Sequence, residues 1–345
     1  MLARIQPAVL TLAEPLRTAF GHVHERAILQ LRLEDGQGNV GWGEAAPLEP
    51  YDGVTLERCR HALEAYLPVL EAPPRPSPSA GAAILDACRA VDPLPQALAA
   101  VDLALWDLAG RREGRPVAAL LADELLTEIP VNLTIGAEDR ATAAALASRA
   151  AAQGFRCVKL KVGVGDDAGR VAAVRAAAGP ELALRLDANG AWDVEDAVRS
   201  IDALAPAGLE LVEEPVHGID ALRQVRRRVA TRVAMDETTA EPGAIASGAT
   251  DAVCLKVSRA GGISGLLAQA ALVRATGAEA YLASTFDGPL GIAAALHCAA
   301  ALRVELPCGL ATLGMFSSVD AGSLAAQDGV IRLPAGPGLG VSPLP

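Results

Sequence analysis

Aromatic residues are scarce in this chain, and several other sequence features are missing altogether. Phe, Trp and Tyr make up only 3% of the 345 residues, whereas apolar residues as a class make up 51%. The core must therefore be built mainly from Ala, Leu and Val. No run of about 18 uncharged apolar residues occurs, so we expect no membrane span. No apolar signal sequence follows Met1, and we therefore expect a cytoplasmic protein.

Paired cysteines and an excess of positive charge are absent as well. The six cysteines are scattered without a Cys-x-x-Cys pair, and we expect the two inside the predicted barrel strands to be reduced and buried. The net charge of −11 argues against binding to nucleic acid or to an anionic membrane surface. It does not exclude a small carboxylate substrate, because salt screens a distant charge beyond about 8 Å. The sequence leaves the oligomeric state open.

Residues 1–125 have the pattern of an α+β domain. Apolar and polar residues alternate over residues 27–33, as in a half-buried strand, and residues 40–45 return as the partner of a hairpin. The pattern becomes helical from residue 55 to 120, interrupted by a Pro-rich surface linker at 72–78. A largely apolar helix over residues 99–110 should end at its glycine and pack between domains.

Residues 126–318 repeat a strand followed by an Ala-rich helical segment, which predicts parallel strands with helical crossovers. The expected strand centres lie about 21 to 28 residues apart, enough for a strand, a helix and two loops. They are Val131, Lys159, Leu186, Val212, Ala234, Leu255, Leu282 and Leu310. The pattern predicts an α/β fold in which eight strands form a barrel. Residues 319–345 are strand-like and rich in Gly and Pro, and we expect them to return to the N-terminal domain.

Polar residues close five successive apolar runs of this predicted barrel. They are Lys159 and Lys161, Asp187, Glu213, Asp236 and Lys256. Because the carboxyl ends of the strands open on one face of a parallel barrel, where active sites lie, we expect these side chains to meet. Three carboxylates without His or Cys suit Mg²⁺ rather than zinc. The alternative is three solvated acids at the barrel rim, which the flanking lysines disfavour.

The lysines suggest what such a site does. Lys159 and Lys161 lie two residues apart on one strand, so both should point into the barrel. Lys256 should approach a substrate from the opposite side of the metal. A lysine becomes a useful base when burial and a second cation lower its pKa, and Lys159 is expected to do this for Lys161. Together these parts describe abstraction of a proton alpha to a carboxylate, with a metal-stabilised enediolate.

Five motifs of this chain resemble the enolase superfamily, and its muconate-lactonizing subgroup in particular. They are Lys159-Leu160-Lys161, Asp187-Ala188-Asn189, Val212-Glu213-Glu214-Pro215, Met235-Asp236-Glu237, and Leu255-Lys256-Val257 with Ala260-Gly261-Gly262-Ile263. The resemblance implies a modified TIM barrel, (β/α)₇β, with an N-terminal α+β capping domain. It also implies Mg²⁺ as the cofactor, held by Asp187, Glu213 and Asp236, and makes Lys161 and Lys256 the acid/base pair.

Within this subgroup, the segments 284–291 and 308–312 are most similar to o-succinylbenzoate synthases of menaquinone biosynthesis. That resemblance implies dehydration of 2-succinyl-6-hydroxy-2,4-cyclohexadiene-1-carboxylate. Lys161 would remove the alpha proton, hydroxide would leave, and Lys256 would stabilise the enediolate. We expect the substrate to be contacted by Asn189, Ser284, Thr285 and, from the capping loop, Arg17.

Other functions remain as alternatives. An N-acylamino acid racemase is the main competitor, because lysines on both faces are what a 1,1-proton transfer requires. Dipeptide epimerases resemble one another in an Asp-x-Asp after the eighth strand, but residues 308–313 here contain no acid. A substrate ammonium there would lack a counter-ion, which disfavours this activity. No feature of the sequence specifically indicates a muconate cycloisomerase. A non-catalytic scaffold should have lost at least one lysine or acid, and all are present.

Overall fold

The computed structural model describes the backbone of all residues except 19–20 and 73–79, and the side chains of all residues except 15–23 and 73–80. All but the first residue of the Pro-rich linker expected at 72–78, and the side chain of Arg17, therefore lie outside the described residues. Within the described part of the chain, no helix combines the length and the hydropathy that a membrane crossing requires.

The N-terminal capping domain begins with a three-stranded antiparallel sheet. β1 (Leu2–Thr18) pairs with β2 (Gly21–Glu34), and β2 pairs with β3 (Val40–Ala45). The expected hairpin is thus confirmed. Leu29, Leu31 and Leu33 of β2 pack into the core of the capping helices. β2 is more buried than the half-buried strand that was expected, because Ile28 on its other face joins the core of the barrel.

Five helices of the described residues complete the capping domain. They are α1 (Glu49–Asp52), α2 (Leu56–Glu71), α3 (Ala80–Val91), α4 (Pro95–Glu113) and α5 (Val117–Leu121). α4 contacts β2 and β3 on one side and α10, α11 and α12 of the barrel on the other, so its expected place between domains is confirmed.

The expected end of this helix at Gly110 is wrong. α4 continues to Glu113, and Gly114 caps it with a left-handed φ of 66°. A glycine is required at position 110 for a different reason. A Cβ there would lie 2.7 Å from the Cα of Gly338, so the missing side chain lets the C-terminal segment pass close to the helix.

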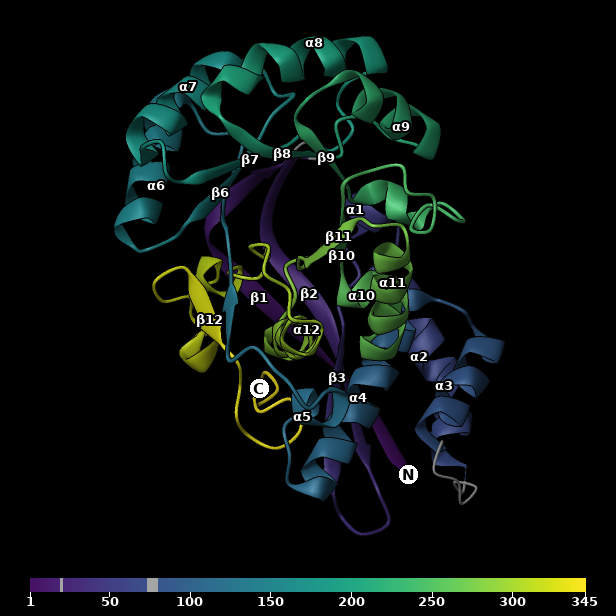
Figure 1. Ribbon diagram of the computed structural model, residues 1–345. Coiled ribbons are helices and arrows are strands. Elements are labelled where there is room, and N and C mark those ends of the chain that lie inside the picture. The colour runs from purple at the N-terminus through teal and green to yellow at the C-terminus, as the bar shows by residue number, and fades with distance from the viewer. Residues whose placement is uncertain (19–20, 73–79) are drawn as a thin grey trace.

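The second domain is a curled parallel sheet of seven strands in the order β5 to β11. The strands are β5 (Leu133–Ile135), β6 (Cys157–Lys161), β7 (Ala183–Asp187), β8 (Leu209–Glu213), β9 (Arg232–Met235), β10 (Ala252–Leu255) and β11 (Glu279–Leu282). The helices that connect them cover the outside of the sheet (Figure 1). They are α6 (Arg140–Ala152), α7 (Asp167–Ala178), α8 (Val194–Leu204), α9 (Ile219–Arg228), α10 (Val257–Ala260), α11 (Ile263–Ala275) and, after β11, α12 (Pro289–Leu302).

The eighth strand expected at Leu310 is only a pair of isolated bridges. Cys308 pairs with Val131 just before β5, and Gly309 pairs with Ala283 just after β11, so these two residues close the ring. Pro307 precedes them and cannot donate a ladder hydrogen bond, which limits the strand. The β9–β10 connection also differs from expectation, since the 3₁₀ turn η2 (Glu237–Ala240) stands where an α-helix was expected.

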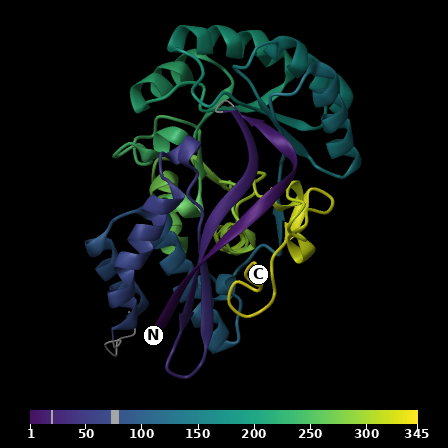
Figure 2. The ribbon, with the colours of Figure 1, turned by 180° about the vertical axis from the view of Figure 1, so that it is seen from behind.

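The C-terminal segment first pairs with the entrance to the barrel and then reaches the capping domain. β12 (Val330–Arg332) pairs antiparallel with β4 (Glu128–Pro130). Further on, the Leu339 N–H donates to Asp107 of α4, and the Leu344 N–H donates to Gln30 of β2. From behind, the yellow C-terminal segment lies beside the purple N-terminal strands (Figure 2).

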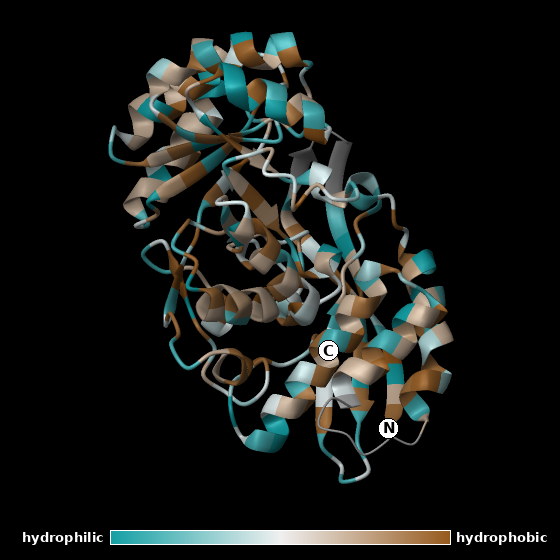
Figure 3. Cartoon of the chain, turned by 45° about the vertical axis from the view of Figure 1, so that its right-hand side comes forward, coloured by the Kyte–Doolittle hydropathy of each residue, from teal (hydrophilic) through white to brown (hydrophobic). Residues whose placement is uncertain are grey.

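The strands of the curled sheet are mostly apolar, whereas the helices around them mix hydrophilic and apolar residues (Figure 3). Residues 290–300 of α12 are all buried, which is expected of a helix that is apolar on every side. Alanines account for much of this packing, as the low aromatic content predicted. All six cysteines are free and buried, including the two in barrel strands for which this was expected.

Candidate active site

The carboxyl ends of strands β6 to β10 bring the expected lysines and acids together. Asp187 and Glu213 end β7 and β8, Asp236 follows β9, and at most 4% of each residue is exposed. The parallel register sets Lys161 beside Asp187, and Asp187 beside Glu213. Buried carboxylates are tolerated only when they are paired or coordinate a metal. In this structure lysine ammonium groups pair with them.

Lys159 and Lys161 both reach Asp187, as the alternation along β6 predicted. Lys159 Nζ lies 3.0 Å from Asp187 Oδ2 and 2.9 Å from Glu213 Oε1. Lys161 Nζ lies 2.7 Å from the same Asp187 oxygen and 2.6 Å from Asn189 Oδ1. Burial works to lower the pKa of Lys159, but Asp187 and Glu213 outweigh it and raise that pKa. Burial likewise works to raise the pKa of Asp187, and the two lysines bring it well below its usual range.

Lys256 approaches the cluster from the other side, directly after β10. Its ammonium donates to Asp236 Oδ1 and, at 2.9 Å, to the hydroxyl of Tyr51 from helix α1. Tyr51 in turn donates to Asp236 Oδ1 at 2.7 Å and accepts from Arg259 Nη1 at 2.7 Å. Burial acts to lower the pKa of Lys256, but Asp236 and the other acidic groups nearby together raise it by more, so the net shift is upward. A capping-domain residue therefore helps to position this lysine.

Glu213, Asp236 and Cys254 form a group that could hold a metal ion, since their ligand atoms lie within 4.8 Å of one another. This group differs from the expected set, because it includes Cys254 and leaves out Asp187. Burial raises the pKa of the Cys254 thiol well above its ordinary value, and sulfur is a soft donor that Mg²⁺ does not favour. The remaining donors are carboxylate oxygens that already attract ammonium cations. Such a donor set fits Mg²⁺ and does not favour zinc.

Glu214 contacts the loop after β9 and makes no hydrogen bond to the lysines among the described residues. Its Oε2 accepts from the backbone N–H of Asp236 at 2.7 Å, and its Oε1 accepts from the N–H of Thr238 at 2.9 Å. His217 Nδ1 lies 3.0 Å from the same Oε1. Glu214 thereby orients the loop that carries Asp236.

The expected substrate contacts have different surroundings. Asn189 belongs to the cluster, because its Oδ1 accepts from Lys161 and its Nδ2 donates to Glu237. The Ser284 hydroxyl pairs with that of Thr312 at 2.9 Å. Thr285 is 2% exposed, its hydroxyl donates to Asp287 at 2.7 Å, and its carbonyl accepts from Arg26 of the capping domain at 3.1 Å, so it takes part in the packing between the domains. The structure thus brings Asn189 to the lysines and directs Thr285 elsewhere.

Sequence reasoning missed four residues of this cluster. Tyr51 contacts Lys256 and Arg259 contacts Tyr51, as described, and the Tyr281 hydroxyl donates to Glu213 Oε2 at 2.6 Å. Burial, with Asp236 and Asp187 nearby, raises the pKa of Glu237 to about 8. One oxygen of Glu237 has no hydrogen-bond partner among the described residues. The only available signal was that Glu237 follows Asp236 directly and that Tyr281 lies in an expected strand.

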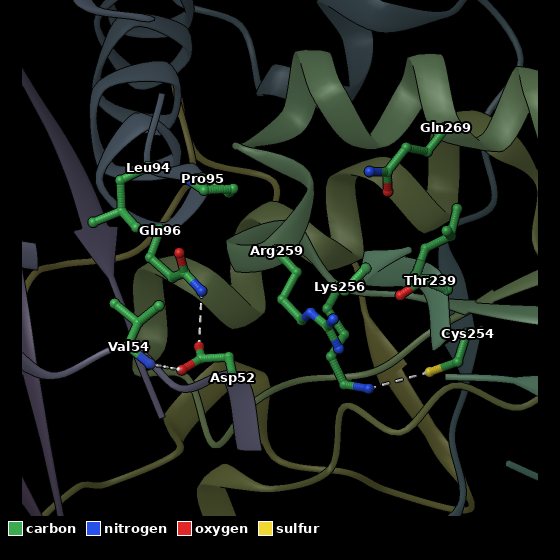
Figure 4. A pocket seen from close by; sticks show the side chains of 12 residues that line it. Asp52, Val54, Leu94, Pro95, Gln96, Thr239, Cys254, Lys256, Arg259 and Gln269 are labelled. Atoms are coloured by element: carbon green, nitrogen blue, oxygen red, sulfur yellow. Dashed lines mark hydrogen bonds between the residues drawn. The ribbon is translucent and has the colours of Figure 1, made fainter. Parts of the chain in front are cut away.

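A cavity of about 360 Å³ adjoins Lys256 between the capping domain and the barrel. Lys256 and Arg259 project into its middle, while Asp52 and Gln96 line the side of the capping domain (Figure 4). Asp52 accepts from the Gln96 side chain at 2.8 Å and from the Val54 N–H at 2.9 Å, which holds the turn next to Tyr51. The volume is within the range of small-molecule sites.

Two family profiles together match almost the whole chain. The profile "Mandelate racemase / muconate lactonizing enzyme, N-terminal domain" matches residues 2–122, and the profile "Enolase C-terminal domain-like" matches residues 141–345. The chain belongs to the enolase superfamily, in its muconate-lactonizing subgroup.

Similar members of the superfamily include epimerases that match over the full length. The L-Ala-D/L-Glu epimerase of Bacillus subtilis is 33% identical over 347 residues, which cover 96% of this chain and 93% of that protein. The structure of a dipeptide epimerase from Enterococcus faecalis V583, complexed with Mg and the dipeptide L-Leu-L-Tyr, has a TM-score of 0.91. It is 27% identical and covers 99% of both chains.

The similarity to o-succinylbenzoate synthase is partial. The enzyme of Thermobifida fusca is 40% identical over 196 residues, which cover 54% of this chain and 60% of that protein. The expectation of a synthase is therefore less well supported than the alternative of an epimerase, and a dehydratase is less well supported than an epimerase or cycloisomerase. The capping domain and the barrel of the enolase fold are confirmed.

Proposed function

We propose that this protein is a Mg²⁺-dependent epimerase or racemase that moves a proton at the carbon alpha to a carboxylate. The observation that best supports it is the position of Lys161 and Lys256 on opposite sides of one carboxylate cluster. A 1,1-proton transfer needs a base on one face of the alpha carbon and an acid on the other. The full-length similarity to epimerases supports the same class of reaction.

In this proposal Asp187, Glu213 and Asp236 hold Mg²⁺. The ion would bind the substrate carboxylate and offset the negative charge that develops as the alpha proton leaves. Lys159 keeps Asp187 ionised, since it is one of the two lysines that lower the pKa of that carboxyl group. Glu214 holds the loop of Asp236 in place through two backbone N–H groups. Asn189 orients Lys161 by accepting from its ammonium.

The two lysines divide the proton transfer. In one direction Lys161 takes the alpha proton and Lys256 returns a proton to the opposite face, and the reverse reaction exchanges their roles. Lys256 is positioned for this by Tyr51, which lies 2.9 Å from its ammonium, and by Arg259, which contacts Tyr51. Each lysine must enter the reaction in the opposite protonation state from its partner.

We propose that the substrate is an N-acylated amino acid, of which the C-terminal residue of a dipeptide is one example. Only that residue of a dipeptide has an alpha proton beside a free carboxylate. The relatives that match over the full length act on dipeptides by their names. Residues 308–313 offer no acid to pair an N-terminal ammonium, which supports acylated substrates as well. N-acylamino acid racemisation is therefore the second candidate activity.

Chiral analysis of two matched substrates, L-Ala-L-Glu and N-acetyl-L-Ala-L-Glu, tests this proposal. With Mg²⁺ we expect epimerisation of the Glu residue, stopped by EDTA, with the acetylated dipeptide at least as good a substrate. Lys161→Ala should lower the rate about 10²–10⁴-fold, the usual contribution of a general base. Metal-dependent loss of the cyclohexadiene carboxylate's ultraviolet absorbance, with neither dipeptide epimerised, would instead establish the synthase.

A further inference from the structure

The two oxygens of Glu213 have different partners. Oε1 accepts from the Lys159 ammonium at 2.9 Å, whereas Oε2 accepts from the Tyr281 hydroxyl at 2.6 Å. Lys159 comes from β6 and Tyr281 from β11. One oxygen therefore faces a cation, and the other is bound by a neutral phenol.

The Tyr281 ring is held firmly inside the barrel. The residue is 2% exposed, and the guanidinium carbon of Arg185 lies 5.0 Å from the centre of its ring. Arg185 is itself fully buried, donating to Glu210 Oε2 at 2.5 Å and to the Pro307 carbonyl at 2.6 Å. Because packing fixes the ring, the hydroxyl stays aimed at Glu213.

We propose that Tyr281 leaves Glu213 only one oxygen for a metal ion, Oε1, and thereby favours Mg²⁺ over Ca²⁺. The inference rests on the proposed role of Glu213 as a metal ligand. Mg²⁺ demands octahedral geometry and binds single carboxylate oxygens, whereas Ca²⁺ takes six to eight oxygens and readily accepts a bidentate carboxylate. Oε2 is poorly available for a metal bond because it accepts the short hydrogen bond from Tyr281, whereas the ammonium on Oε1 has a second acceptor in Asp187 and can leave Oε1 to a metal ion. Tyr281 is thus a positioning residue.

Tyr281→Phe removes the hydroxyl and keeps the ring against Arg185. Glu213 Oε2 is then buried without a donor, and a second metal–oxygen bond becomes the best way to satisfy it. We expect Mg²⁺ to bind more weakly and Ca²⁺ to lose less affinity or gain some. The ratio of the Ca²⁺ and Mg²⁺ dissociation constants should fall about tenfold, the effect of one hydrogen bond to a charged group.

Isothermal titration of the full chain with Mg²⁺ and with Ca²⁺ measures this ratio without any substrate. Tyr66→Phe is the matched control, because Tyr66 is also fully buried but donates to the backbone carbonyl of Asp92 in the capping domain. Its ratio should equal that of the wild type. Thermal melting in EDTA verifies that both variants are folded.

The outcomes separate the two proposals. If the wild type binds Mg²⁺ in preference to Ca²⁺ and Tyr281→Phe keeps the ratio within about twofold, the inference is wrong and the proposed function stands. If the wild type does not bind Mg²⁺, both are wrong. A crystal structure of the wild type with Mn²⁺ gives an answer even when the variant does not fold. It should show Glu213 bound through Oε1 alone with Tyr281 still on Oε2, and a bidentate Glu213 would overturn the inference.

Discussion

Single residues in the loops that follow three of the barrel strands adopt backbone conformations that residues other than glycine rarely take. Asn189, Glu214 and Phe286 have φ values of 45°, 39° and 57°, and they follow β7, β8 and β11. Such strain often occurs at functional sites, where surrounding contacts compensate for it. At Glu214, hydrogen bonds compensate for the backbone strain, because its carboxylate accepts from the backbone N–H groups of Asp236 and Thr238.

Glu214→Gln should therefore weaken metal binding although Glu214 is not a proposed ligand. Both oxygens of Glu214 accept hydrogen bonds, and an amide provides only one acceptor oxygen, so a buried N–H group would face an NH₂ group. We expect Mg²⁺ affinity to fall about 10–100-fold and stability to fall by about 1–3 kcal/mol. Titration calorimetry and urea unfolding measure these effects. The control is Glu195→Gln, which removes an exposed ion pair with Arg228 and should change neither the Mg²⁺ affinity nor the stability. An unchanged Mg²⁺ affinity in Glu214→Gln would argue against the role of Glu214.

Residue types and spacing predicted the lysines and the acids, but not the two tyrosines. Lys161, Asp187 and Glu213 end strands, so their place at one mouth follows from the barrel. Tyr281 is 68 residues from Glu213 in sequence, and in a strand it looks like any core aromatic residue. Tyr51 is 185 residues from Asp236 and depends on how the capping domain docks. Long-range contacts of this kind leave no local pattern.

Strand β3 lies very close to helix α4 at two of its glycines. A Cβ on Gly43 would lie 1.9 Å from the Ala100 carbonyl oxygen, and one on Gly41 would lie 2.2 Å from that of Ala104. The strand therefore rests directly on the helix backbone. This contact fixes the capping domain near the barrel, because α4 also contacts α10, which follows Lys256.

Gly43→Ala should push β3 away from α4. We expect a loss of about 1–3 kcal/mol in the free energy of unfolding, as for other overpacked cores. The control is Gly36→Ala in the β2–β3 turn, where a Cβ would meet nothing within 4 Å. Thermal melting of the two variants tests this. Equal melting temperatures for Gly43→Ala and the wild type would show that the strand and helix can separate without cost.

For the whole molecule, the strand–helix pattern predicted the capping domain and the barrel but not how the barrel closes. Residues near Leu310 looked like a full strand, yet only Cys308 and Gly309 form bridges, because a sequence pattern does not show how many ladder bonds a segment makes. The 3₁₀ turn between β9 and β10 was missed for a similar reason. The domain boundaries at residues 125 and 318 stay predictions.

His297 of α12 joins three distant parts of the chain. Its Nδ1 accepts from the Ala118 N–H of α5 at 3.1 Å, and its Nε2 lies 3.1 Å from the Leu339 carbonyl of the C-terminal segment. This pattern requires a neutral ring with its proton on Nε2. Burial lowers the pKa of His297 to about 4, although the Leu339 carbonyl acts in the opposite direction.

This histidine should make stability depend on pH. Between about pH 6.5 and 4, His297 is protonated in the unfolded chain but neutral in the folded protein. The free energy of unfolding therefore decreases as the pH falls through that range. His297 should contribute up to about 3 kcal/mol to the loss. His297→Gln should reduce the slope of stability against pH, whereas the exposed His61→Gln should not. Urea unfolding at several pH values is the measurement, and parallel curves for wild type and His297→Gln would contradict the account.

The central claim is that Lys161 and Lys256 serve opposite faces of one alpha carbon. Proton NMR in D₂O, with Mg²⁺ and both N-acetyl-L-Ala-L-Glu and N-acetyl-L-Ala-D-Glu, tests it most directly in the wild type, Lys161→Ala and Lys256→Ala. The wild type should exchange the alpha proton of both diastereomers. Each variant should lose epimerisation but keep exchange with one diastereomer, and the two variants should keep opposite ones. Loss of exchange with the same diastereomer in both variants, or no loss in either, would contradict the account.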